Sequence, residues 1–212
     1  MILWIIGLII LIYIIFRLKT IYKINFKSFF KKGFSTFYNE FGLFCFCGKQ
    51  GSGKTYSAIR YLIDNRVGDS YLLTNVLSYS KKYPSIYMSN IMDIINFCKE
   101  HEHDGKQIYI FFDEIFTILE KKTAISKEIL SFISQLRKRS IVFITTAQEW
   151  SEINITFRRY VRFEIACKIV SLPFSHTAVF FNSVHDGDTI HWNQETQDFE
   201  ADLIQVNIHK RQ

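Results

Sequence analysis

The chain has 212 residues, enough for one domain with appendages, and 48% of them are apolar, which supports a sizeable core without long low-complexity tracts or internal repeats. Its net charge of +6 comes entirely from residues 1–39, which hold six basic side chains and no acidic one, so the charge does not by itself indicate nucleic acid. The four cysteines form no C-x-x-C pair, which argues against a zinc site and favours a reduced, cytosolic setting.

The N-terminal stretch 1–16 carries no charged side chain. As a helix it would cover ~24 Å of a hydrocarbon core that is ~30 Å thick, and Leu18 with the stems of Arg17 and Lys19 would extend it. We therefore expect residues 1–19 to be a transmembrane anchor, against two alternatives, a signal peptide and a helix that docks on a partner. A signal peptide would favour a basic start and a small-residue cleavage site, and neither is present.

Positive charge follows the apolar stretch, which predicts a single-pass protein with its N-terminus outside and the rest of the chain in the cytoplasm. Residues 20–40 form a basic juxtamembrane linker, in which Phe and Lys alternate irregularly. This mixture suits a segment lying along lipid headgroups, with a strand or helix packed at the edge of the core as the alternative. Residues 41–212 are then the folded domain, with a β-rich C-terminal extension.

The segment 48–55 reads GKQGSGKT and fits the phosphate-binding pattern G-x-x-x-x-G-K-[ST]. It follows an apolar strand at 41–47 and precedes a helical pattern at 54–63, in which Ala58, Ile59, Leu62 and Ile63 share one face. Glycines let the backbone N–H groups converge on anionic oxygens, and the helix N-terminus adds positive charge. The predicted nucleotide-binding residues are Gly48, Lys49, Gln50, Gly51, Ser52, Gly53, Lys54 and Thr55. The expected ligands are ATP and Mg²⁺, with Lys54 on the phosphates and Thr55 on the metal.

A second apolar run, 108–112, ends in Asp113-Glu114 and resembles a Walker B element. That resemblance implies that Asp113 holds Mg²⁺ and that Glu114 polarises the attacking water. The alternative is a pair of acids that merely caps the next helix. Two strand-like segments, 71–76 and 85–88, lie between the two motifs and predict an additional strand between their strands in the sheet.

A third strand is predicted at 140–146 and leads to Gln148. At the tip of a strand beside Asp113, this side chain would reach the γ-phosphate or the water, unless it is a loop residue without a role. Further along, Arg158 and Arg159 precede a strand at 160–169. Either arginine is a candidate arginine finger supplied to a neighbouring subunit, with solvated arginines as the alternative.

Helices are predicted over 91–100, with Ile91, Ile94, Ile95 and Cys98 inward, and over 126–139, with an apolar stripe that ends in Arg137, Lys138 and Arg139. His101 and His103 lie at a helix end, where solvent exposure is favoured over metal binding. The segments 177–181 and 189–192 flank Asp186-Gly187 and predict a hairpin that turns at this dipeptide.

These motifs together resemble the ATPase domain of zonular occludens toxin-like proteins, the filamentous-phage assembly ATPases of the FtsK–HerA superfamily. The likeness rests on GKQGSGKT, TNV at 74–76, FFDE at 111–114, LRKRSIVFITTAQ at 136–148 and FRRYVRF at 157–163. It implies an α/β P-loop NTPase of the additional-strand, catalytic-glutamate class, with a mostly parallel sheet and helices on both faces. The implied partners are a membrane, phage DNA, other virion assembly or coat proteins, and further copies of the chain in a ring.

One departure matters, because those relatives usually carry their membrane segment after the ATPase domain. This keeps a sibling function open, a genome-packaging ATPase of a membrane-containing icosahedral virus. Two rivals come from other classes. A membrane-tethered nucleotide-binding interaction protein would not need Glu114, and a small-molecule kinase would need an arginine-rich lid that the sequence does not show.

Overall fold

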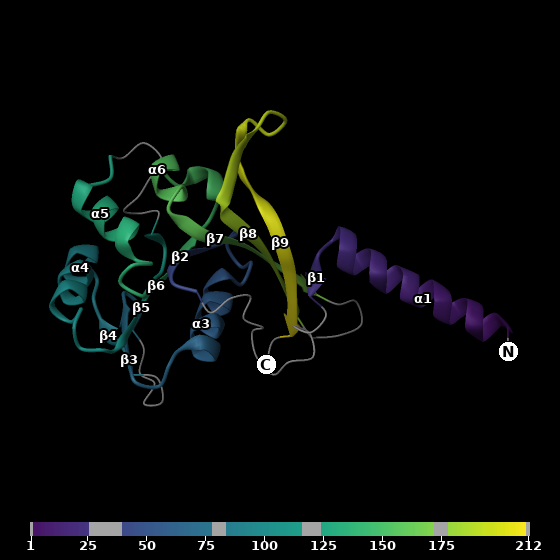
Figure 1. Ribbon diagram of the computed structural model, residues 1–212, viewed down its shortest axis with the longest axis horizontal. Coiled ribbons are helices and arrows are strands. Elements are labelled where there is room, and N and C mark those ends of the chain that lie inside the picture. The colour runs from purple at the N-terminus through teal and green to yellow at the C-terminus, as the bar shows by residue number, and fades with distance from the viewer. Residues whose placement is uncertain (1, 26–39, 78–83, 116–123, 172–177, 211–212) are drawn as a thin grey trace.

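The computed structural model describes residues 2–25, 40–77, 84–115, 124–171 and 178–210, which form a layered α/β domain with an extended N-terminal helix (Figure 1). The strands are β1 (Ile24–Asn25), β2 (Gly42–Cys47), β3 (Ser70–Thr74), β4 (Ile86–Tyr87), β5 (Gln107–Phe112), β6 (Ile141–Ala147), β7 (Val161–Ser171), β8 (Ala178–Asn193) and β9 (Asp198–Lys210). The helices are α1 (Ile2–Ile21), α3 (Lys54–Asn65), α4 (Ile91–Glu100), α5 (Lys127–Gln135), α6 (Ile155–Arg158) and the 3-10 turn η2 (Trp150–Glu152).

The strands form one sheet in the order β1-β9-β8-β7-β2-β6-β5-β3-β4. From β7 to β4 every pairing is parallel, while β8 is antiparallel to both β7 and β9. An additional strand does separate the strands of the two nucleotide motifs, as predicted. It is β6, which follows β5 in the sequence, whereas β3 and β4 lie on the far side of β5. The predicted class of mostly parallel P-loop sheet is confirmed.

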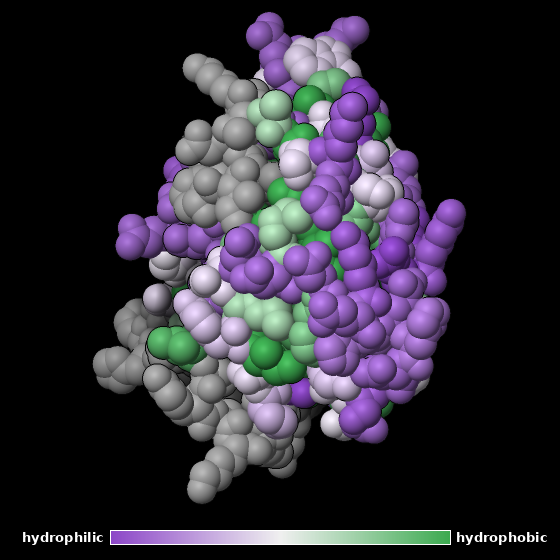
Figure 2. Space-filling view, turned by 90° about the vertical axis from the view of Figure 1, so that its left-hand side faces the viewer, coloured by the Kyte–Doolittle hydropathy of each residue, from purple (hydrophilic) through white to green (hydrophobic). Residues whose placement is uncertain are grey.

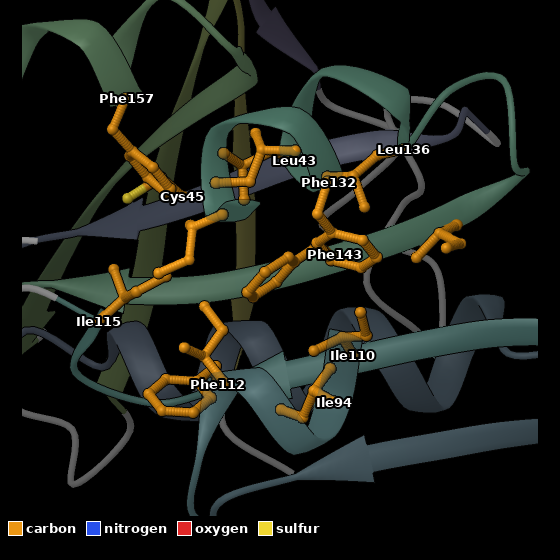
Figure 3. Close-up of a cluster of buried hydrophobic side chains, with 14 of the residues drawn as sticks. Leu43, Cys45, Ile94, Ile110, Phe112, Ile115, Phe132, Leu136, Phe143 and Phe157 are labelled. Carbon is orange, nitrogen blue, oxygen red and sulfur yellow. The ribbon is translucent and has the colours of Figure 1, made fainter. Parts of the chain in front are cut away.

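Helices cover both faces of the sheet, and its central strands β2, β5 and β6 are accordingly buried at nearly every position. All six residues of β2 are buried, so alternate side chains enter two separate cores. Leu43 and Cys45 point into the core under α4 and α5. Figure 3 shows this core, in which they pack with Phe112, Ile115 and Phe143. Phe44 and Phe46 point into the other core, under α3.

Helices α3 and α4 agree with their predicted bounds to within two residues, whereas α5 ends at Gln135 and not at the predicted Arg139, so Arg137, Lys138 and Arg139 lie in the turn that follows it. In α4 all four predicted core residues are buried, and Asn90 caps the helix by accepting a hydrogen bond from the Met92 N–H at 2.9 Å. In α5 the predicted stripe is buried and Ser126 is the N-cap. The inward face predicted for α3 was partly wrong, because Ile59 and Ile63 are more than a third exposed. Its buried face runs instead through Ser57, Ala58, Tyr61 and Leu62.

The predicted hairpin turn at Asp186-Gly187 was wrong. Both residues lie inside β8, and the turn joins β8 to β9 after Asn193. The register between β8 and β9 shifts between Asp186 and His191, so the dipeptide marks a bulge rather than a turn. A Cβ atom at Gly187 would lie 1.7 Å from the carbonyl oxygen of Val161, so the glycine allows a close backbone approach.

The N-terminal helix α1 is continuous and exposed, and it extends away from the sheet (Figure 1). By length and composition, its residues Trp4–Ile21 could cross a membrane, and a signal sequence near an N-terminus would pass the same test. Strand β1 follows almost at once and pairs with β9, so this part of the predicted linker 20–40 is an edge element. The linker residues Lys27, Lys31 and Lys32 lie outside the described residues.

At the other end of the sheet, Ile86 and Tyr87 of β4 are exposed. Figure 2 views the molecule from the side that carries α4 and α5 and shows a largely hydrophilic described surface with apolar residues between. Scattered apolar residues of this kind are ordinary on a protein surface.

Candidate nucleotide site

The loop of residues 48–53 connects the C-terminal end of β2 to the N-terminus of α3, as the motif requires. The N–H of Gly48 donates to the carbonyl oxygen of Ala147 at 3.2 Å, which attaches the loop to the end of β6. Gly53 has φ = 82°, and a Cβ atom there would lie 2.5 Å from the ring of Phe180. Glycine is therefore required at position 53 both by its backbone conformation and by the space available.

Two features of the loop fit a phosphate. The N-cap residue of α3 is Gly53, which has no side chain to accept from the first N–H groups of the helix. The hydroxyl of Ser52 is buried without a hydrogen-bond partner among the described residues. Buried polar groups are normally paired, so an anionic oxygen at this helix N-terminus would satisfy both features. Lys54, which is 8% exposed, supplies positive charge at the same place.

Asp113 lies at the end of β5 and faces the loop. Its Oδ1 accepts hydrogen bonds from the hydroxyl of Thr55 at 3.3 Å and from the hydroxyl of Thr146 at 2.5 Å. The structure thus brings together the two predicted metal ligands, Thr55 and Asp113, which are 58 positions apart in the sequence. Mg²⁺ prefers oxygen ligands and usually keeps several waters beside one or two carboxylates and phosphate oxygens, so this pair fits such an ion.

Two residues that the sequence analysis gave no role hold this end of β5 in place. The side chain of Asn75 accepts from the N–H of Asp113 at 2.7 Å and donates to its carbonyl oxygen at 3.0 Å. The hydroxyl of Thr146 accepts from the N–H of Glu114 at 2.8 Å. Asn75 belongs to the TNV segment and Thr146 to the polar end of the third predicted strand. Both segments were recognised in the sequence, but neither residue could be given a function from it.

Glu114 is exposed and has φ = 55°, a left-handed conformation that is uncommon for a residue other than glycine. Because the backbone turns here, the side chain of Glu114 leaves the strand directly after Asp113. Strained conformations of this kind persist where the surroundings impose them, and here the bonds from Asn75 and Thr146 do so. The site therefore separates a metal-facing carboxylate from an exposed one.

Gln148 is exposed and follows the last residue of β6. Strand β6 lies between β2 and β5, and the bond from Gly48 to Ala147 places Gln148 next to the start of the phosphate loop. This is the position predicted for it, at the tip of the strand beside Asp113. Its role toward a phosphate or water stays a prediction.

The two candidate finger arginines differ sharply. Arg158 is 2% exposed, and its guanidinium donates to Asp198 at 2.9 Å and lies over the ring of Trp150. A side chain held in this way within its own subunit is not placed to reach a neighbour, so the structure contradicts Arg158 as the finger. Arg159 is exposed and lines a cavity of about 200 Å³ together with Arg137 and Tyr160.

Arg159 is far from the phosphate loop of its own chain. It precedes β7, which runs parallel to β2 with Val161 beside Leu43, whereas the loop follows the opposite end of β2. The two ends are roughly 15–20 Å apart at the usual rise per strand residue. Arg159 can therefore meet a nucleotide only on another molecule.

The cysteines Cys45, Cys47, Cys98 and Cys167 are all buried, and none forms a disulfide. Contact with the Cys45 thiol, followed by burial, raises the pKa of Cys47 well above its usual value, and burial raises the pKa of Cys167. Burial also raises the pKa of Cys98 to about 12. Neutral, buried thiols are poorly reactive, so the chemistry of this site rests on oxygen and nitrogen groups.

The geometry is that of a P-loop NTPase: a loop that fits phosphate, a hydroxyl and a carboxylate that could hold Mg²⁺, and a second carboxylate that is exposed. The sequence matches the ATPase family associated with various cellular activities (AAA) over residues 44–170, and the chain belongs to this family. It is thus an ATP-binding P-loop ATPase, as predicted. A search of the curated proteins found no match.

Several solved structures share this fold. The N-terminal domain of zonular occludens toxin from Neisseria meningitidis is 18% identical, with a TM-score of 0.50 over 66% of this chain and 82% of that one. The genome-packaging NTPase B204 from Sulfolobus turreted icosahedral virus 2, in complex with AMPPCP, is 13% identical, with a TM-score of 0.53 over 80% and 98%. The pCW3 conjugation coupling protein TcpA is 12% identical, with a TM-score of 0.50 over 81% and 61%.

Proposed function

We propose that this chain is a membrane-anchored ATPase that couples ATP hydrolysis to the movement of phage DNA during virion assembly. The observation that carries the proposal is the combination, in one chain, of the Asp113–Glu114 pair beside the phosphate loop with an exposed apolar helix joined to the same sheet. The first part supports hydrolysis rather than binding alone. The second supports an enzyme that works at a membrane.

In this proposal α1 spans the host cell membrane once, with its N-terminus outside and the ATPase domain in the cytoplasm, where ATP is available. Mg²⁺ bound to Thr55 and Asp113 would neutralise charge on the phosphates. Glu114 orients the attacking water and accepts its proton, while Lys54 and the N–H groups of the loop hold the β- and γ-phosphates. Gln148 contacts the γ-phosphate or the water from the end of β6.

The chain acts as a ring of identical subunits. Arg159 of one subunit stabilises charge on the nucleotide of the next, since it is exposed and too far from its own phosphate loop. The ring would contact DNA and the other virion assembly or coat proteins. The DNA function rests on likeness to the zonular occludens toxin domain and to B204, which is analogy at the level of fold.

The packaging alternative has support of its own. The match to this chain covers 98% of B204, a genome-packaging NTPase, so the same domain also suits movement of DNA into a particle. A tethered nucleotide-binding interaction protein is the third candidate. It differs from both motors because it predicts no dependence of ATP turnover on DNA.

The test is ATP hydrolysis by the detergent-solubilised full chain, alone and with single- or double-stranded DNA, beside Glu114→Gln. We expect DNA to raise the rate and Glu114→Gln to lower kcat by about 10²–10⁴-fold while ATP binding is retained, because only the general base is lost. A preference for single strands would favour extrusion, and a preference for duplex would favour packaging. Turnover that is negligible in all mixtures and unchanged in Glu114→Gln would refute both motors and leave the tethered binding protein.

A further inference from the structure

A row of polar side chains crosses the antiparallel part of the sheet and joins the segment after α1 to the helix after the phosphate loop. Asn25 in β1 lies directly opposite Asn207 in β9, and Asn207 lies directly opposite Asn182 in β8. The amide of Asn25 donates to Oδ1 of Asn207 at 3.2 Å. At the far end, Oδ1 of Asn182 accepts from the hydroxyl of Ser57 at 3.3 Å, and the amide nitrogen of Asn182 lies 3.2 Å from that hydroxyl.

The middle of this row is buried. Ser57 and Asn182 are fully inaccessible, and Asn207 is 1% exposed. Three uncharged polar side chains in a core are unfavourable unless they are paired, and apolar residues would fill the same space without that penalty. None of the three contacts the Asp113 cluster directly, so hydrolysis alone does not account for them. Buried polar groups of this kind specify register and arrangement more than stability.

One end of the row lies beside the phosphate loop, where Ser57 and β8 contact the start of α3. Ser57 lies in the first turn of α3, and its N–H donates to the carbonyl oxygen of Gly53 at 2.9 Å. Two residues before Asn182, the ring of Phe180 packs against Gly53 and stacks on Tyr56 with 4.7 Å between ring centroids. Strand β8 therefore contacts the backbone of Gly53 and the side chains of Tyr56 and Ser57 at the start of α3.

The other end of the row lies where β1 pairs with β9. The N–H of Val206 donates to the carbonyl oxygen of Lys23 at 2.9 Å, and the amine of Lys23 donates to the carbonyl oxygen of Leu203. Strand β1 has only two residues, and α1 ends three residues before it. A short strand held by few bonds opens at low free energy, so its attachment is open to regulation.

The row is one hydrogen bond short of continuous. The amide nitrogen of Asn207 is buried without a partner among the described residues, although Asn182 lies directly opposite. Oδ1 of Asn207 instead accepts from both Asn25 and Gln205. A buried donor without a partner beside the Asn182 amide leaves a further pairing open, in which the two amides would hydrogen-bond to each other. A coupled element requires a second arrangement of this kind.

We propose that Asn182 and Asn207 are positioning residues that couple nucleotide bound at the phosphate loop to the seating of β1 on β9, and so to the attachment of α1. Bound nucleotide holds the start of α3 in one position, so that Ser57 keeps its hydrogen bond to Asn182. Asn182 then hydrogen-bonds to Asn207, which orients Asn207 to accept from Asn25 and so keeps β1 on β9. The proposal rests on nucleotide binding and is independent of what the enzyme moves. Linkage makes the effect reciprocal, so a change at β1 must alter nucleotide affinity by the same factor.

The test is hydrogen exchange of the full chain in detergent, with and without Mg²⁺ and ATPγS, following peptides that cover 22–25 and 203–208. In the unmodified chain we expect nucleotide to slow exchange at Val206 by about five-fold or more. Asn182→Leu, which keeps the volume and removes the amide, should bind ATPγS and lose this response. If Asn182→Leu does not fold, Asn25→Ala serves instead, since Asn25 lies in the edge strand β1 and is only partly buried.

Asn25→Ala should weaken ATPγS binding by about five-fold, because the coupling is reciprocal. The matched control is Asn193→Ala, on β8 but at the opposite end of the hairpin, where it donates to Glu200. This control should retain both the exchange response and the affinity. The proposal is overturned if nucleotide leaves exchange at Val206 unchanged in the unmodified chain, or if Asn25→Ala binds ATPγS as tightly as that chain.

Discussion

The parallel part of the sheet, β2 to β6, and the antiparallel part, β7 to β9, are built on different principles. In the parallel part every central strand is buried on both faces, and polar groups occur where strands end, at Asp113, Thr146 and the phosphate loop. In the antiparallel part polar and charged residues lie within the strands themselves, as in Asn182, Asn207 and Glu164. The parallel part has its polar groups at one edge of the sheet, while the antiparallel part has polar contacts along the length of its strands, as far as β1 and the N-terminal helix α1.

The largest effect is expected when a hydroxyl at the end of a parallel strand is removed while the shape of the side chain is kept. Thr146→Val deletes the bonds to the Asp113 carboxylate and to the N–H of Glu114. Misplacing catalytic groups by about an ångström can lower turnover about 10²-fold. We expect a loss in kcat of about that size with a small change in the KM for ATP, measured by steady-state hydrolysis.

The neighbouring threonine is a close control. Thr145 is equally buried, but its hydroxyl donates to the carbonyl oxygen of Phe112 at 2.8 Å and not to either carboxylate. Thr145→Val should therefore reduce stability by about 1 kcal/mol, through loss of one hydrogen bond, and leave kcat within a few-fold. Equal losses of kcat in the two variants would show that β6 acts only through its stability.

The second prediction compares two adjacent arginines at the boundary between the parts. Arg158→Ala leaves Asp198 without its buried partner, so the free energy of unfolding should fall by about 3 kcal/mol. Arg159→Ala removes an exposed side chain and should change stability by less than about 0.5 kcal/mol. Chemical denaturation in detergent measures both. Similar stabilities for the two variants would contradict the structural role assigned to Arg158.

Much of the parallel part could be predicted because its motifs are local. GKQGSGKT at the end of one apolar run and Asp113-Glu114 at the end of another predict the loop, both strands and the two candidate metal ligands that the structure brings together. Which strand separates them could not be read in the same way, since the order of a sheet is set by tertiary packing. The same reasoning explains Arg158 and Arg159, whose sequence context is shared but whose burial depends on Asp198, forty residues away.

The antiparallel part was harder to predict for a physical reason. Gly187 follows an aspartate, which is typical of a tight turn, yet its lack of a side chain serves the close approach to Val161. The row from Asn25 to Ser57 likewise depends on cross-strand register over more than 180 positions, which no local pattern reports. The buried row of asparagines could not be predicted, because each asparagine alone resembles an ordinary polar residue of a strand.

The smallest expected effect lies near the tip of the β8–β9 hairpin, at the hydrogen bonds to the carboxylate of Glu200. Hydrogen bonds from Asn193 and then from Thr196 lower the pKa of Glu200. A carboxyl whose pKa is lower in the folded chain stabilises it above the ordinary pKa, and this contribution is lost as pH falls through the lowered value. Asn193→Ala should raise the pKa of Glu200 toward its ordinary value, measured by NMR titration of labelled glutamate. Since Glu200 contacts Asn193 and Thr196 at the hairpin tip and not the phosphate loop, hydrolysis should not change, and a matching loss of turnover would mean that the hairpin tip contributes to the reaction.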